Sequence, residues 1–169
     1  MVASGHLDEL RDGPAVHAGW CYVVSGGVVN TGIWWDPSTW ARARAAYVYD
    51  LDHHPRAPAG FIHWLHWVIE VHAARGPEGR TALDVPARPE LAADVGLTRM
   101  HPLRSEVLES MDQAVVEDRA AGRLLSRSAW LHEAVVAAIA DAEARSGGPL
   151  RPLPAGARLP NRPRKAGTL

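Results

Sequence analysis

The segment that most constrains the fold is a Ser-Arg-Ser run that leads directly into a long apolar helix pattern. Ser126 and Ser128 carry side-chain oxygens that can accept hydrogen bonds from backbone N–H groups at a helix start. At about 100° per residue, the apolar side chains that follow extend around much of the helix surface. They are Trp130, Leu131, Ala134, Val135, Val136, Ala138, Ile139, Ala140 and Ala142. A lone small domain could hardly cover this surface, so the pattern favours a dimerising helix.

A second, narrower apolar stripe precedes this helix. Its members recur at helical spacing and are Val107, Leu108, Met111, Ala114 and Val115. Polar side chains occupy the opposite side, and Gly122 then offers a residue that tolerates the left-handed conformation in which helices end. Residues 97–104, before the stripe, read as a short extended segment. The pattern predicts an extended segment, a helix, a short turn and a second helix.

These elements resemble the ribbon-helix-helix family of DNA-binding repressors and antitoxins. The match is carried by Ser-Arg-Ser-Ala-Trp-Leu-His-Glu-Ala-Val at 126–135 and by a first helix that contains 107–112. In that family two chains pair their short strands into a ribbon that enters the major groove, and the second helices form the dimer core. The resemblance over 98–145 implies a homodimeric transcriptional regulator, autoregulatory or antitoxin-like.

The resemblance also implies which residues contact DNA. The N–H groups at the start of the second helix suit a phosphate oxygen, while side chains of the ribbon read base edges. The implied residues are Thr98, Arg99, Met100, His101, Arg104, Ser126, Arg127 and Ser128. Counting by two from Leu103 puts His101 and Arg99 inward and leaves Pro102, Met100 and Thr98 outward. Pro102 also lacks an N–H, which a strand tolerates on its unpaired side or at a bulge. Two capped helices that bind no DNA are the alternative.

The charge distribution bears on DNA binding in two opposing ways. The net charge is −1, yet residues 146–169 contain five basic side chains and no acidic one, so the rest of the chain is markedly acidic. An acidic body disfavours non-specific affinity for phosphates, and a basic tail supplies part of it. This proline-rich tail has little apolar surface to bury, so we expect it to be disordered.

Cysteine content and hydropathy indicate the compartment. Cys21 is the single cysteine, so an intrachain disulfide is excluded and a reducing compartment is favoured. The first residues lack an apolar run of signal-peptide length, and no apolar run approaches the roughly 20 residues that cross a bilayer. We expect a cytoplasmic protein without a membrane association and without a cofactor.

The first half predicts an α+β domain at residues 1–80. Two β-branched and aromatic runs, 20–24 and 28–35, flank Ser-Gly-Gly and indicate a β-hairpin. Asp36 before Pro37 is a helix start, and helices are expected from Pro37 to Asp50 and over 59–74. Residues 81–96 are expected to form a linker, with an extended stretch at 81–85 and a helical turn at 89–94. The expected architecture is this domain, a ribbon-helix-helix module at 97–145 and a disordered tail at 146–169.

Histidines in the first half offer an alternative function as an enzyme. Asp-Leu-Asp-His-His-Pro at 50–55 is similar to the His-His-Pro signature of pterin carbinolamine dehydratases, which also have an upstream Gly-Trp, as at 19–20 here. A further histidine of that family would correspond to His72. This resemblance implies His53, His54 and His72 as catalytic residues, because imidazole can donate and accept the proton moved in a dehydration.

A metal site is a second alternative in the same region. In a helix, His63, His66 and Glu70 project within a narrow arc, so two imidazoles and a carboxylate could meet a Zn²⁺ ion. His53 or His54 would supply a fourth ligand. A solvated polar helix face explains the same residues.

Five tryptophans fall within a short stretch of the first half: Trp34, Trp35, Trp40, Trp64 and Trp67. Each can bury a large apolar area, so they are expected to form the core of the first domain. The alternative is an aromatic surface for a partner protein or a small ligand, since tryptophan is enriched at binding hot spots.

Overall fold

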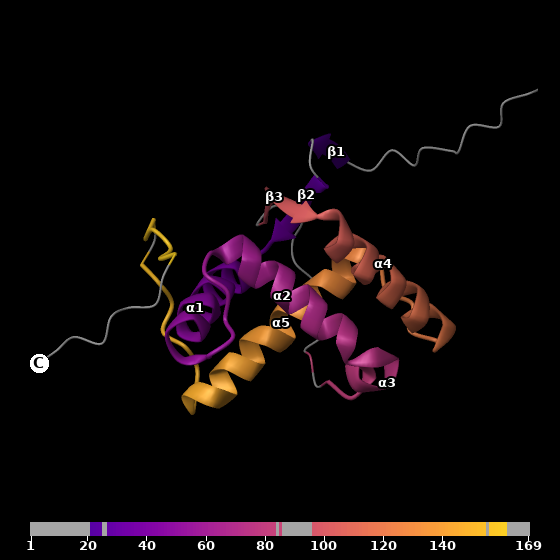
Figure 1. Ribbon diagram of the computed structural model, residues 1–169. Coiled ribbons are helices and arrows are strands. Elements are labelled where there is room, and N and C mark those ends of the chain that lie inside the picture. The colour runs from indigo at the N-terminus through magenta and orange to yellow at the C-terminus, as the bar shows by residue number, and fades with distance from the viewer. Residues whose placement is uncertain (1–20, 25–26, 84, 86–95, 155, 162–169) are drawn as a thin grey trace, which may run out of the picture.

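An antiparallel three-stranded sheet lies at one end of a group of five helices, which makes this a mixed α+β fold (Figure 1). The computed structural model describes residues 21–24, 27–83, 85, 96–154 and 156–161. The strands are β1 (Cys21–Val24), β2 (Val28–Trp35) and β3 (Leu97–Arg104), in the order β1-β2-β3. The helices are α1 (Pro37–His53), α2 (Phe61–Ala74), α3 (Gly76–Thr81), α4 (Ser105–Ala120) and α5 (Arg127–Ser146).

The first half forms the expected hairpin and two long helices. β1 and β2 pair antiparallel, and the Asp36 carboxylate accepts a 2.8 Å hydrogen bond from the Thr39 N–H at the start of α1. α1 continues three residues beyond the predicted end, to His53. The predicted end of this helix at residue 74 is right, but a short helix, α3, follows at once, because Pro77 has no N–H to lose in a first turn.

Two expectations for the linker have different outcomes. The extended stretch expected at 81–85 is wrong at its start, since Thr81 belongs to α3 and Ala82 caps that helix through its N–H. The helical turn expected at 89–94 lies outside the described residues.

β3 pairs along its whole length with β2 of the same chain. Val28 lies opposite Arg104 and Trp35 lies opposite Leu97 at the two ends of the pairing. The family resemblance assigns this strand to a ribbon formed by two chains. The backbone groups on one side of the strand are instead paired with β2 of the same chain.

One hydrophobic core spans both halves of the sequence. It includes residues of β2, α1 and α2 and residues of β3, α4 and α5, among them Trp35, Tyr47, Trp64, Leu103, Met111 and Ile139. Trp35 and Trp64 are buried as expected for core residues, while Trp40 and Trp67 pack against the core from its margin. The division between 1–80 and 97–145 therefore does not separate two cores.

The apolar face of α5 is covered within the chain. Trp130, Leu131, Val135 and Ile139 are all buried, and α5 packs against α1 and α2. The dimer core expected at this helix is thus occupied by two helices of the first half, which supply the apolar surface that the sequence pattern left unpartnered.

The tail expected to be disordered is partly packed on α1. Leu150, Leu153 and Leu159 lie against the hydrophobic core. The Tyr47 hydroxyl donates to the Pro160 carbonyl, and that hydroxyl accepts a hydrogen bond from a backbone N–H in the loop before α2. The expectation of disorder rested on the proline-rich composition of the tail. Three leucines among the prolines nevertheless supply enough apolar surface to pack part of the tail against the core.

Candidate nucleic-acid interface

The β2–β3 ribbon has one buried face and one exposed face. Ile33, Trp35 and Leu103 point toward the helices and are buried. On the opposite face of β3, Thr98 is exposed and Met100 is 48% exposed. Alternate residues of a strand point to opposite faces, so the sequence pattern correctly placed these two side chains outward.

A glycine at the centre of the exposed face makes room for its neighbours. Gly32 lies opposite Met100 in the register. A Cβ added at Gly32 would lie 3.2 Å from Thr98 Cγ2 and 3.5 Å from Met100 Sδ. Because Gly32 has no side chain, the side chains of Thr98 and Met100 can lie across β2 at this position. The exposed face of the ribbon is therefore not interrupted by a bulky β2 side chain there.

Pro102 lies where a strand tolerates proline. The Ser105 N–H donates to the Gly27 carbonyl, so the odd-numbered residues of β3 turn their backbone groups toward β2 and the even-numbered ones turn theirs to the free edge. The Arg104 N–H accordingly faces away from β2 and donates to His66 Nε2 at 3.3 Å. The missing N–H of Pro102 thus costs no ladder bond.

Two residues of the predicted DNA-binding set lie on the helix side of the ribbon. His101 is 5% exposed, and its Nε2 accepts a hydrogen bond from Trp35 Nε1 at 3.1 Å. Arg99 extends over the Trp40 ring, 4.6 Å from its centroid. His101 therefore cannot reach a base edge from the folded chain, which corrects its assignment as a DNA-reading residue.

The start of α5 is capped as predicted. Ser126 Oγ accepts a hydrogen bond from the Ala129 N–H at 3.2 Å, and this leaves the N–H groups of Arg127 and Ser128 without a partner inside the helix. The Arg127 guanidinium forms an ion pair with Asp112 of α4, with Nε 2.7 Å from Oδ1 and both side chains about half exposed. The capped helix start is therefore present, and its first residues are exposed to solvent; that it binds phosphate stays a prediction.

This first turn of α5 lies beside the ribbon. Ser128 lines one pocket together with Gly32 and Trp34 of β2 and with Thr39 from the start of α1. The pocket lies at the part of β2 that extends beyond its pairing with β1, which ends at Thr31. The structure therefore places the predicted helix start beside β2, the strand that pairs with the predicted DNA-reading strand β3.

The catalytic histidines of the alternative function are not brought together. His53 is exposed and stacks on the Tyr49 ring at 4.4 Å, while the His54 ring lies 5.1 Å from that of Trp67. His72 is 1% exposed, and its Nε2 contacts the Glu133 carboxylate at 3.1 Å. The Gly-Trp of that resemblance lies outside the described residues. The three histidines thus have separate partners, and a shared active site is not formed.

The residues of the metal-site alternative also lie in surroundings that differ from the expected ones. His66 is buried rather than part of a solvated face, and its Nε2 is taken by the Arg104 N–H. Glu70 pairs with the Arg104 guanidinium at 2.8 Å. Within the described part of the chain, no group of three His, Cys, Asp or Glu side chains is arranged to hold a metal ion.

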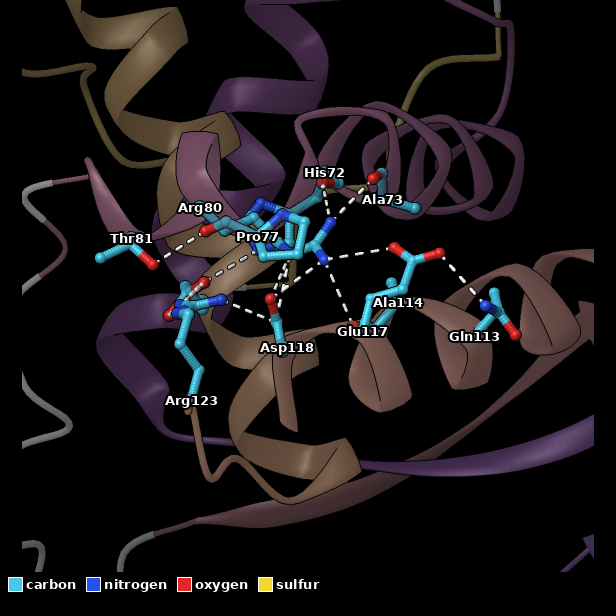
Figure 2. Close-up of polar contacts among 11 residues, drawn as sticks. His72, Ala73, Pro77, Arg80, Thr81, Gln113, Ala114, Glu117, Asp118 and Arg123 are labelled. Atoms are coloured by element: carbon cyan, nitrogen blue, oxygen red, sulfur yellow. Dashed lines mark hydrogen bonds and ion pairs between the residues drawn. The ribbon is translucent and has the colours of Figure 1, made fainter. Parts of the chain in front are cut away.

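A buried charge network, which the sequence analysis missed, joins α2, α3, α4 and α5 (Figure 2). Arg80 and Asp118 are fully buried, with Arg80 Nε 3.0 Å from Asp118 Oδ1. Arg123 lies 2.6 Å from the same carboxylate and 2.8 Å from Glu133, which in turn contacts His72. Each charge has an opposite partner, as buried ions require. The network holds the turn between α4 and α5 against α3, which makes it structural support for the start of α5.

Burial lowers the pKa of His72 to about 4, and burial together with the nearby charge of Arg99 lowers the pKa of His101 to about 4. In the unfolded chain each ring takes up a proton near pH 6.5, whereas in the folded chain burial keeps each ring neutral down to about pH 4. The two histidines therefore do not oppose folding above pH 6.5, and the free energy of unfolding decreases as the pH falls from 6.5 toward 4. We expect a loss on the order of 3 kcal/mol per histidine at pH 4. Urea unfolding at a series of pH values from 7.5 to 4 measures it.

The variant His101→Gln separates this effect from general acid unfolding. Glutamine has no charge to gain in this range, so the stability of the variant should fall less steeply with acid than that of the unsubstituted chain. Equal slopes for the two proteins would show that His101 does not contribute.

The exposed face includes two positions that the sequence analysis did not select. Asn30 lies opposite Pro102 and Gly32 lies opposite Met100, so both belong to the outward set of β2. The sequence shows that Asn30 and Gly32 alternate with the apolar residues Val29 and Ile33. It does not show that Asn30 and Gly32 share an exposed face with residues of β3, because that depends on the pairing of β3 with β2.

No described helix is long and apolar enough to cross a bilayer. Comparison with protein-family models, with curated proteins and with solved structures finds no match for this chain. We therefore infer function from the exposed ribbon and the adjacent start of α5.

Proposed function

We propose that this protein is a DNA-binding transcriptional regulator that reads sequence with the exposed face of its β2–β3 ribbon. The observation that supports this is an eight-residue antiparallel pair, packed on helices through one face and open on the other. The major groove of B-DNA admits a two-stranded β-ribbon. Asn30, Thr98 and Met100 would present an amide, a hydroxyl and an apolar tip to base edges. The Arg104 guanidinium would reach a base only by giving up its exposed ion pair with Glu70, which contributes at most about 1 kcal/mol.

The start of α5 would hold the phosphate backbone beside the groove. The free N–H groups of Arg127 and Ser128 and the positive end of the helix dipole suit a phosphate oxygen. Exposed ion pairs contribute at most about 1 kcal/mol, so Arg127 can exchange Asp112 for a phosphate at little cost. Both ribbon strands come from one chain, unlike the two-chain ribbon of the family it resembles. Homodimerisation, an antitoxin-like role and a ligand or partner protein for the first half stay predictions.

Replacing Thr98 and Met100 together by alanine should remove sequence preference while non-specific binding persists. Lost base contacts cost about 1–3 kcal/mol each, whereas phosphate contacts are unaffected. The measurement is fluorescence anisotropy of the full chain with DNA from its own upstream region and with unrelated DNA, at two salt concentrations.

Val116→Ala is the matched control, because Val116 is an exposed apolar residue of α4 away from the ribbon. It should leave the preference unchanged. The proposal fails if the unsubstituted chain binds both DNAs equally at both salt concentrations.

A further inference from the structure

A cluster of two arginines and one tryptophan lies beside β3. The Arg99 guanidinium carbon lies 4.6 Å from the centroid of the Trp40 ring, and that of Arg44 lies 5.9 Å from it. The Trp40 ring packs at steep angles on Trp35 and Phe61, with centroids 5.1 and 5.4 Å away. The core therefore fixes the ring, and the ring positions both guanidinium groups on one surface.

The charge of this cluster is not neutralised by neighbouring carboxylates. Among the described residues, Arg42, Arg104 and Arg127 each form an ion pair with an acid, but neither Arg44 nor Arg99 does. Asp36, one turn before Trp40, is buried and occupied by the capping bond from α1. The positive charge is effective locally, since Arg99 contributes to the lowered pKa of His101.

The packed tail adds to the same surface. Arg44 also donates to the Ala157 carbonyl, and the next residue, Arg158, is exposed. The described part of the tail thus places a third cationic residue next in sequence to the residue that Arg44 contacts, although the body of the chain is acidic.

We propose that Trp40, Arg44 and Arg99 form a phosphate-binding surface that contacts the DNA backbone on the β3 side of the ribbon. This inference rests on the proposed function. The start of α5 lies at the edge of β2, and the Trp40 cluster lies beside β3. A ribbon inserted into a groove would therefore have a phosphate contact on each side: the N–H groups of α5 beside β2 and the two guanidinium groups beside β3. Trp40 acts here as a positioning residue, because guanidinium groups lie over its ring and occupy the place that a stacked base would need.

The test uses the full chain and a random-sequence duplex of about 30 base pairs, a probe that does not depend on knowing the operator. Each phosphate contact contributes about 0.9 to the slope of log affinity against log salt. The double variant Arg44→Gln/Arg99→Gln should lower that slope by about 2 and weaken binding accordingly. Arg44→Lys/Arg99→Lys keeps both charges and should restore most of the slope, which excludes misfolding as the cause.

Arg56→Gln/Arg119→Gln is the control, because both residues are exposed arginines outside the cluster. It should leave the slope unchanged. An unaltered slope in the Arg44→Gln/Arg99→Gln variant, or an equal fall in the control, overturns the inference. Neither result affects sequence preference, so the proposed function is judged separately by the Thr98 and Met100 variant. If the unsubstituted chain fails to bind the duplex at all, both proposals fall.

Discussion

Replacing Asp118 by asparagine should lower the free energy of unfolding by about 3–5 kcal/mol, because it removes the buried counter-ion of Arg80 and leaves only the half-exposed Glu117 carboxylate, 3.8 Å away. The Arg80 side chain is fully buried, and both oxygens of Asp118 accept from its Nε, at 3.0 and 3.1 Å. Arg80 also donates to the Ala73 carbonyl of α2 at 2.7 Å and to the Ala114 carbonyl of α4 at 3.2 Å. Losing its position would therefore loosen three helices at once. Urea unfolding followed by far-ultraviolet circular dichroism measures the change.

Asp112→Asn provides the matched control for this prediction. Asp112 is another α4 aspartate paired with an arginine, but its side chain is 51% exposed. An exposed pair contributes at most about 1 kcal/mol, so this variant should unfold close to the unsubstituted chain. Comparable losses in the two variants would mean that burial of the Arg80–Asp118 pair does not determine its contribution.

Replacing Trp130 by alanine should also lower the free energy of unfolding by about 3–5 kcal/mol, since it opens a large cavity in the core. Trp130 is fully buried, its ring lies 4.7 Å from that of His72, and the Arg80 guanidinium lies 5.8 Å from its centroid. Urea unfolding gives the loss, and sedimentation velocity at several concentrations gives the association state.

Packing of α5 within its own chain and packing of α5 in a dimer interface predict different outcomes for Trp130→Ala. If the helix packs within its own chain, Trp130→Ala destabilises the fold at every protein concentration. A stable variant that merely changes from dimer to monomer would contradict the intrachain packing. Trp130→Phe keeps most of the ring and removes an indole N–H that has no partner among the described residues, so its loss should be much smaller.

Histidine positions illustrate why residue type alone did not locate a site. His63 and His66 share a helix, yet His66 is buried under β3, while His53 and His72 lie in different surroundings on α1 and α2. A hydrogen bond from a backbone N–H of β3 to His66 and a hydrogen bond between His72 and Glu133 of α5 decide these surroundings. Both partners are far from the histidines in the sequence, so local spacing could not reveal them.

Local physics in the sequence determined the strands and the long helices, but not the short helix α3. The hairpin turn, the Asp36 and Ser126 caps and the apolar periodicity of α4 and α5 were sufficient, because each depends on residues within a few positions. Only the tertiary structure decided which surfaces meet. It paired β3 with β2, covered α5 with α1 and α2, and placed Arg99 of β3 over Trp40 of α1. An apolar face needs cover, but its composition does not specify whether a second chain or a distant segment of the same chain provides it.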